Sequence, residues 1–165
     1  MLYIFERFVH FLSWRAAQLA QLAMVIVMGI TVINIIIRIP FRPIGGAVEL
    51  VEMFGAIMLG FGVAYTALVK GHIMVGILVD RFSPRIQGVI EAIVNVIAFF
   101  FSYILAREIL LFAYDRMEAG YVTGHLDIPI APSIYLVGAG FVIFCLVILL
   151  QLIKAIITVI KGSET

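Results

Sequence analysis

Residues 134–160 read IYLVGAGFVIFCLVILLQLIKAIITVI, a run in which Lys154 is the single charged residue. A helix needs about 20 mostly apolar residues to cross the ~30 Å hydrocarbon layer of a membrane, and this run is long enough. Three further apolar stretches of similar length lie at residues 16–37, 47–69 and 89–111. The sequence therefore predicts an all-α integral membrane protein with four transmembrane helices.

The composition agrees with this prediction and limits the possible functions. Hydrophobic residues make up 64% of the 165 residues and charged residues 13%, and a soluble domain would carry about 25% charged residues. Four spans leave room for one domain, so we expect a single membrane domain over residues 1–165. The net charge of +1 gives no electrostatic support for a nucleic-acid partner.

Residues that carry chemistry do not form a catalytic or metal-binding pattern. His10, His72 and His125 all lie outside the four stretches, so neither a haem-ligating pair nor a metal cluster is expected. There is no nucleophile elbow or phosphate loop. Cys145 is the single cysteine, which excludes an internal disulfide. We predict a protein that is not an enzyme and that holds no cofactor or metal.

The N-terminal segment before the first span has an amphipathic pattern. Phe5, Phe8, Val9 and Leu12 recur at helical spacing, and Glu6, Arg7 and His10 lie between them. This pattern is typical of a short helix in the membrane interface. The alternative is a cytoplasmic extension of the first span.

Basic residues predict the orientation in the membrane. Seven of them fall on the side that holds both termini and four on the other, and cytoplasmic loops carry the excess of Lys and Arg. The seven are Arg7, Arg15, Lys70, Arg81, Arg85, Lys154 and Lys161. We therefore expect both termini in the cytoplasm.

Polar residues cluster where spans one and two approach the outer loop. Asn34 and Arg38 stand at the end of span one, and Glu49 and Glu52 stand one turn apart at the start of span two. Ionisable groups in a bilayer need partners, and the short loop brings these ends together. We predict that Arg38 pairs with Glu49 or Glu52; the alternative is that these residues mark the membrane boundary.

Small residues follow Glu52 along span two, at Ala56, Gly60 and Ala64. Small residues at such spacing let helix backbones approach closely, so we expect this stripe to pack against another helix of the chain or of a partner. Glu91, near the inner end of span three, is a further membrane carboxylate. It is expected at interfacial depth or bonded to a basic residue, with ion coupling as the alternative.

An ordered set of motifs resembles the small membrane subunit of tripartite ATP-independent periplasmic (TRAP) transporters, the DctQ-like family. Asn34, Arg38 and Phe41 are similar to the family's end of span one, and Glu49 and Glu52 to its acidic start of span two. The run KGHIMV at 70–75 resembles its signature at the inner end of span two. TGHLDIP at 123–129 is similar to its loop before span four.

The resemblance implies a scaffold subunit in the bacterial inner membrane that binds a large membrane subunit holding the substrate and sodium sites. A periplasmic protein would deliver an organic acid, such as a dicarboxylate, a sialic acid or a sulfonate. Gly71 and His72 would shape the inner loop. The candidate contacts with the binding protein are the outer-loop residues Arg42, Asp115, Glu118 and Asp127.

Two other hypotheses remain open from the residues alone. The chain could be a self-sufficient ion-coupled transporter or channel that forms a homo-oligomer, with Glu52 or Glu91 as the coupling carboxylate. It could also be the membrane anchor of a redox enzyme, although the lack of histidines within the spans argues against this.

Overall fold

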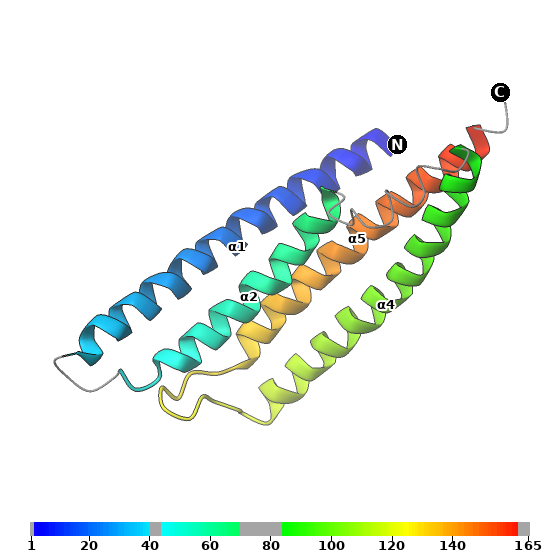
Figure 1. Cartoon of the computed structure of the whole chain (residues 1–165). Helices are drawn as coiled ribbons and strands as arrows, with labels where there is room; N and C mark the ends of the chain where they lie inside the picture. Colours follow the sequence, from blue (N-terminus) through cyan, green and yellow to red (C-terminus); the bar gives the residue numbers. More distant parts are fainter. Residues whose placement is uncertain (1, 40–43, 70–83, 162–165) are drawn as a thin grey trace.

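The computed structural model describes residues 2–39, 44–69 and 84–161. Within them lie four helices, α1 (Leu2–Arg38), α2 (Ala47–Leu68), α4 (Pro84–Glu118) and α5 (Ala131–Lys161) (Figure 1). Each is long and apolar enough to cross a membrane, and no strand occurs among the described residues. The predicted fold class of an all-α, four-span membrane protein is confirmed.

The segment before the first span is helical, but it is not a separate helix. α1 runs without a break from Leu2 to Arg38, so the extension of span one is the arrangement found. Of the residues predicted to share an apolar face, Val9 is buried and Phe8 is exposed. Phe5 and Leu12 are partly buried and pack against the core, so three of the four predicted residues lie on the packed face. The buried seam of α1 continues from Val9 with spacings of four and three residues through Ser13, Ala16, Ala20 and Ala23.

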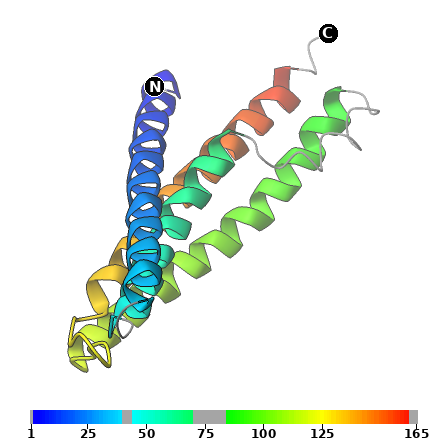
Figure 2. The same ribbon diagram turned by 60° about the vertical axis from the view of Figure 1, so that its left-hand side comes forward.

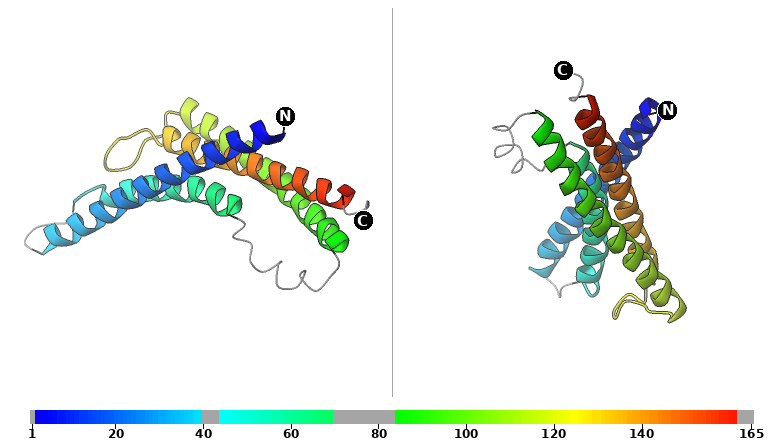
Figure 3. Two further views of the ribbon diagram at one scale, coloured as in Figure 1. Left: turned by 90° about the horizontal axis from the view of Figure 1, so that it is seen from above. Right: turned by 90° about the vertical axis from the view of Figure 1, so that its right-hand side faces the viewer.

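α5 is the central helix of the bundle. It packs on α4, α2 and α1, and α1 packs mainly on α2. α1 and α4 lie at opposite edges (Figure 2), and α1 crosses the α4–α5 pair at an angle (Figure 3, right). Both termini lie at one end, which we call the terminal end, and residues 44–46 and 119–130 lie at the other, the loop end (Figure 1).

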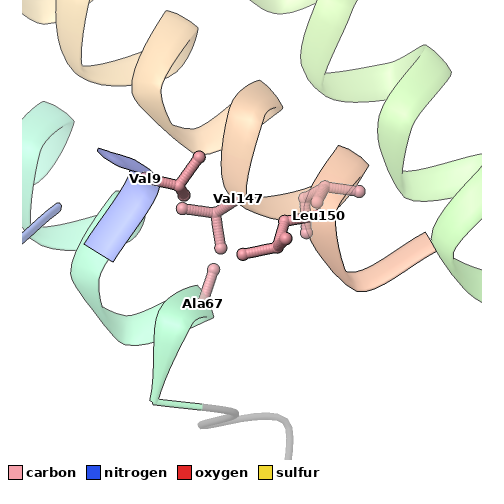
Figure 4. Packing of buried hydrophobic residues seen from close by; sticks show 5 residues of the cluster. Val9, Ala67, Val147 and Leu150 are labelled. Carbon is pink, nitrogen blue, oxygen red and sulfur yellow. The ribbon is translucent and has the colours of Figure 1, made fainter. Parts of the chain in front are cut away.

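A cluster of buried side chains joins three helices near the terminal end. Val9 of α1, Ala67 of α2, and Val147, Ile148 and Leu150 of α5 form it (Figure 4). Phe99 of α4 packs against its edge. Because a lipid environment gives little hydrophobic drive for helix association, such close packing is a main source of bundle stability.

Glycines of α5 face two different neighbours. An added Cβ on Gly140 would overlap the Gly60 carbonyl group and come within 2.9 Å of the Phe61 nitrogen, so the α2 and α5 backbones are in direct contact. On Gly138 it would lie 2.6 Å from Leu110 Cδ2 of α4. Glycine is therefore required at 140 for α5 to sit this close to α2, whereas at 138 the close atom is the end of the Leu110 side chain, which can move.

Candidate functional site

The connection between α4 and α5 is an ordered hairpin at the loop end. α4 ends in a Schellman motif, in which the Tyr121 N–H donates to Arg116 O at 3.2 Å and the Gly120 N–H to Met117 O at 3.2 Å. Gly120 has a φ of 63°, the left-handed conformation that this motif requires. The guanidinium of Arg116 lies 4.2 Å from the Tyr121 ring centre, which adds a cation–π contact at the helix end.

Backbone hydrogen bonds then pair the two arms of this hairpin, residues 121–130. Val122 and Pro129 form an antiparallel bridge. The Thr123 N–H donates to Ile128 O at 2.9 Å, and the Ile128 N–H donates to Thr123 Oγ1 at 3.2 Å. Asp127, at the turn, has a φ of 52°, a left-handed conformation that Asp and Asn adopt more readily than most residues.

Glu49, in the first turn of α2, holds the tip of the hairpin. Its Oε1 accepts the backbone N–H of His125 at 2.9 Å and lies 3.1 Å from His125 Nδ1. Its Oε2 accepts the Leu126 N–H at 3.3 Å. The Glu49 side chain is 18% exposed and the His125 side chain 72% exposed. The carboxylate therefore acts as an anchor that fixes a segment 76 residues away in the chain.

Leu126 completes this anchor by lying directly on Gly46. Gly46 precedes α2 and has a φ of 84°. A Cβ added to Gly46 would overlap the Leu126 side chain, with Cδ1 at 2.8 Å. Both the backbone conformation and the close approach require glycine here. We call the hairpin 121–130 with Gly46 and Glu49 the anchored hairpin.

Asn34 organises the other connection at this end, because its Oδ1 accepts the Ile44 N–H at 3.0 Å. No ion pair joins Arg38 to Glu49 or Glu52 in the part of the chain that the structure describes. The physical reason is that the Glu49 carboxylate is already occupied by the hairpin backbone. Arg38 and Glu52 are both exposed.

Three of the predicted contact residues are acidic and lie in or next to the anchored hairpin. Asp115, Glu118 and Asp127 are all exposed at the loop end. Glu118 accepts a hydrogen bond from the Tyr114 hydroxyl at 2.7 Å. The fourth predicted contact residue, Arg42, lies outside the described residues.

Different contacts hold the terminal end together. Glu6 of α1 forms an ion pair with Lys154 of α5. The Gln151 amide donates to Ala67 O, a carbonyl in the last turn of α2, at 2.5 Å. Gly71 and His72 lie outside the described residues, and Glu91 is exposed on α4.

The stripe of small residues on α2 divides between two environments. Gly60 and Ala64 are buried, and Gly60 lies against Val137 and Gly140 of α5. Ala56 is exposed and borders a groove between α2, α4 and α5. The sequence analysis did not identify the contacts of Gly140, Leu126 and Gln151. For Gly140 a signal was available, because Gly138 and Gly140 are closely spaced glycines in an apolar run.

Four membrane-length helices, with the anchored hairpin between α4 and α5, define a multi-pass membrane protein. Among the described residues, no group of three or more His, Cys, Asp or Glu side chains is placed to hold a metal ion. Two grooves on the described surface are lined mainly by apolar side chains.

Comparison with known families identifies the protein class. The family model for the DctQ component of tripartite ATP-independent periplasmic transporters matches residues 27–158, and the chain belongs to this family. It is a small membrane subunit of a TRAP transporter, and membership implies association with a large membrane subunit and a periplasmic binding protein. No curated protein and no solved structure matches the chain.

Proposed function

We propose that this chain is the non-catalytic scaffold subunit of a sodium-coupled transporter for organic acids in the bacterial inner membrane. The substrate and the sodium ions bind to the large subunit, and this chain holds that subunit in place. Its loop end faces the periplasm and helps dock the binding protein. The substrate is a dicarboxylate, a sialic acid or a sulfonate.

The anchored hairpin is the observation that best supports a docking role. A loop that is fixed by Glu49 and by the Leu126–Gly46 contact loses little conformational entropy when a partner binds, and preorganisation of this kind favours affinity. It also lies at the end opposite both termini (Figure 1). The excess of basic residues on the terminal side supports cytoplasmic termini, which puts the hairpin in the periplasm.

Charge gives the docking surface its expected specificity. Asp115, Glu118 and Asp127 are exposed around the hairpin, and complementary charge at an interface raises the association rate and selects partners. We therefore expect a basic patch on the face of the binding protein that meets this chain.

Transport in proteoliposomes tests the scaffold role. The large subunit is reconstituted with or without this chain, and labelled dicarboxylate, sialic acid or sulfonate is supplied with the binding protein under an inward sodium gradient. We expect uptake of one substrate class only when all three proteins and sodium are present. Full uptake without this chain would exclude the scaffold role. Uptake at the same rate with and without sodium would exclude coupling to the sodium gradient.

A charge variant tests the docking role. Glu118→Gln with Asp127→Asn removes two charges while keeping an acceptor for Tyr114 and a residue suited to the left-handed conformation at 127. We expect half-maximal uptake to need about tenfold more binding protein at an unchanged maximal rate. Glu91→Gln, on α4 near the terminal end, is the control and should not alter this requirement. An unchanged requirement in the double variant would exclude the docking role of these carboxylates.

A further inference from the structure

A groove lies between α2 and α4 near the loop end, because both helices pack on α5 and make no extensive contact with each other. Its volume is about 390 Å³. The apolar side chains that line it come from all three helices: Ala56 of α2, Leu105, Ile109 and Phe112 of α4, and Ile134 and Val137 of α5. Phe112 of α4 and Ala56 of α2 are both exposed. No other part of the described chain therefore covers these two sides of the groove.

The two polar residues that border this groove already have partners. The Ser133 hydroxyl donates to Ile130 O at 2.7 Å, and Glu108 forms an ion pair with Arg107. Neither group therefore needs a partner from another molecule. The lining is apolar, as expected of a surface that receives a membrane helix or a lipid chain.

Glu52 is different. It stands four residues before Ala56, so it lies one turn nearer the loop end on the same side of α2. Its side chain is exposed, and in the described part of the chain it has neither an ion pair nor a side-chain hydrogen bond. A carboxylate on a spanning helix is costly unless a counter-charge meets it. The rim of the groove thus carries a carboxylate that no residue in the described part of the chain pairs with.

We propose that the groove receives a transmembrane helix of the large subunit, and that a Lys or Arg of that helix, near its periplasmic end, pairs with Glu52. This inference rests on the proposed function and names the face of the chain that makes the scaffold contact. The charge of Glu52 favours this occupant, because an acyl chain would fill the apolar groove without matching the carboxylate. No ion pair joins Arg38 to Glu52 among the described residues.

Site-specific photo-crosslinking in the intact complex tests which face is covered. A photoreactive phenylalanine analogue replaces Ala56 or Phe112 in the groove and, as controls, Met28 or Val32 on the exposed side of α1. We expect both groove positions to crosslink to the large subunit and both α1 positions to fail. Crosslinks from α1 and none from the groove would overturn the inference, as would groove crosslinks to lipid alone. Failure of the chain to co-purify with a large subunit at all would instead reject the proposed function.

Charge reversal tests the ion pair. We expect Glu52→Lys to reduce the large subunit co-purified per tagged chain by about tenfold, and Glu52→Asp to reduce it much less. Glu91→Lys is the matched control, because it reverses another exposed carboxylate on a spanning helix, and it should leave the yield unchanged. The thermal unfolding of each variant in detergent shows that the bundle itself is intact. Equal yields from Glu52→Lys and wild type would overturn the pairing. Replacing the partner Lys or Arg in the crosslinked helix by Glu should restore the yield of the Glu52→Lys variant.

Discussion

Gly60 and Gly140 bring the backbones of α2 and α5 into direct contact, since a side chain on Gly140 would overlap the Gly60 carbonyl. This contact sets the position of the central pair of helices. It also sets how far α2 stands from α4, because both pack on α5. The groove proposed as the scaffold interface therefore depends on this pair of glycines.

Gly140→Ala should destabilise the bundle. The added methyl group forces α2 and α5 apart, and overpacking of this kind costs about 1–3 kcal/mol. The measurement is thermal or denaturant unfolding of the purified chain in detergent. Gly62→Ala is the matched control, because nothing lies within 4 Å of an added Cβ there; it should be neutral or slightly stabilising, since alanine favours helix. Equal stability of the two variants would contradict the close contact.

Gly46→Ala should also destabilise the chain, for a different reason. The residue has a φ of 84° and its Cβ would overlap Leu126, so the substitution adds backbone strain of about 1–3 kcal/mol and a steric clash. Gly45→Ala, where an added Cβ meets only His125 Cδ2 at 3.8 Å, should have little effect. The double variant Gly46→Ala with Leu126→Ala separates the backbone strain from the steric clash, because it removes the clash and leaves the strain. If Gly46→Ala and Gly45→Ala unfold alike, the Leu126 contact is not as described.

Glu49→Ala should loosen the hairpin without unfolding the bundle. The N–H groups of His125 and Leu126 lose their acceptor, so their hydrogen exchange should speed up by about tenfold, as expected for loss of a bond to a charged acceptor. Amides in the middle of α5 should keep their exchange rates. Glu52→Ala serves as the control, because Glu52 holds no part of the hairpin among the described contacts. Unchanged exchange at 125 and 126 would argue against the anchor.

The spans were predictable because a membrane helix must form all of its backbone hydrogen bonds internally and must present apolar side chains to the lipid. This requirement appears in the sequence as long apolar runs. Two helices extend well beyond the predicted spans. α4 continues to Glu118, beyond the predicted span end at residue 111, because charged residues such as Asp115 and Arg116 continue the helix past the hydrocarbon layer. Likewise, α1 begins at Leu2, because its seam from Val9 onward packs on the rest of the bundle.

The partners of the polar residues were not predictable in the same way. Glu49 and Glu52 are similar in sequence, yet Glu49 binds backbone N–H groups of a hairpin 76 residues away and Glu52 faces outward. Every residue except proline has a backbone N–H group, so the sequence does not show which of these groups Glu49 binds. The side-chain pattern therefore predicted Arg38, a nearby cation, as its partner. The family motif TGHLDIP did mark the hairpin as a conspicuous segment, although it did not reveal that Glu49 holds it.

The orientation of the chain decides whether the anchored hairpin can meet a periplasmic protein. In a Cys145→Ser background, Ala119→Cys places a thiol at the exposed end of α4 beside the hairpin, and Tyr3→Cys places one at the exposed start of α1. We expect a membrane-impermeant thiol reagent, applied to cells with a permeable outer membrane, to label Ala119→Cys at once and Tyr3→Cys only after the inner membrane is opened. The basis is the excess of Lys and Arg on the terminal side. The reverse pattern would place the hairpin in the cytoplasm, where it could not contact the binding protein.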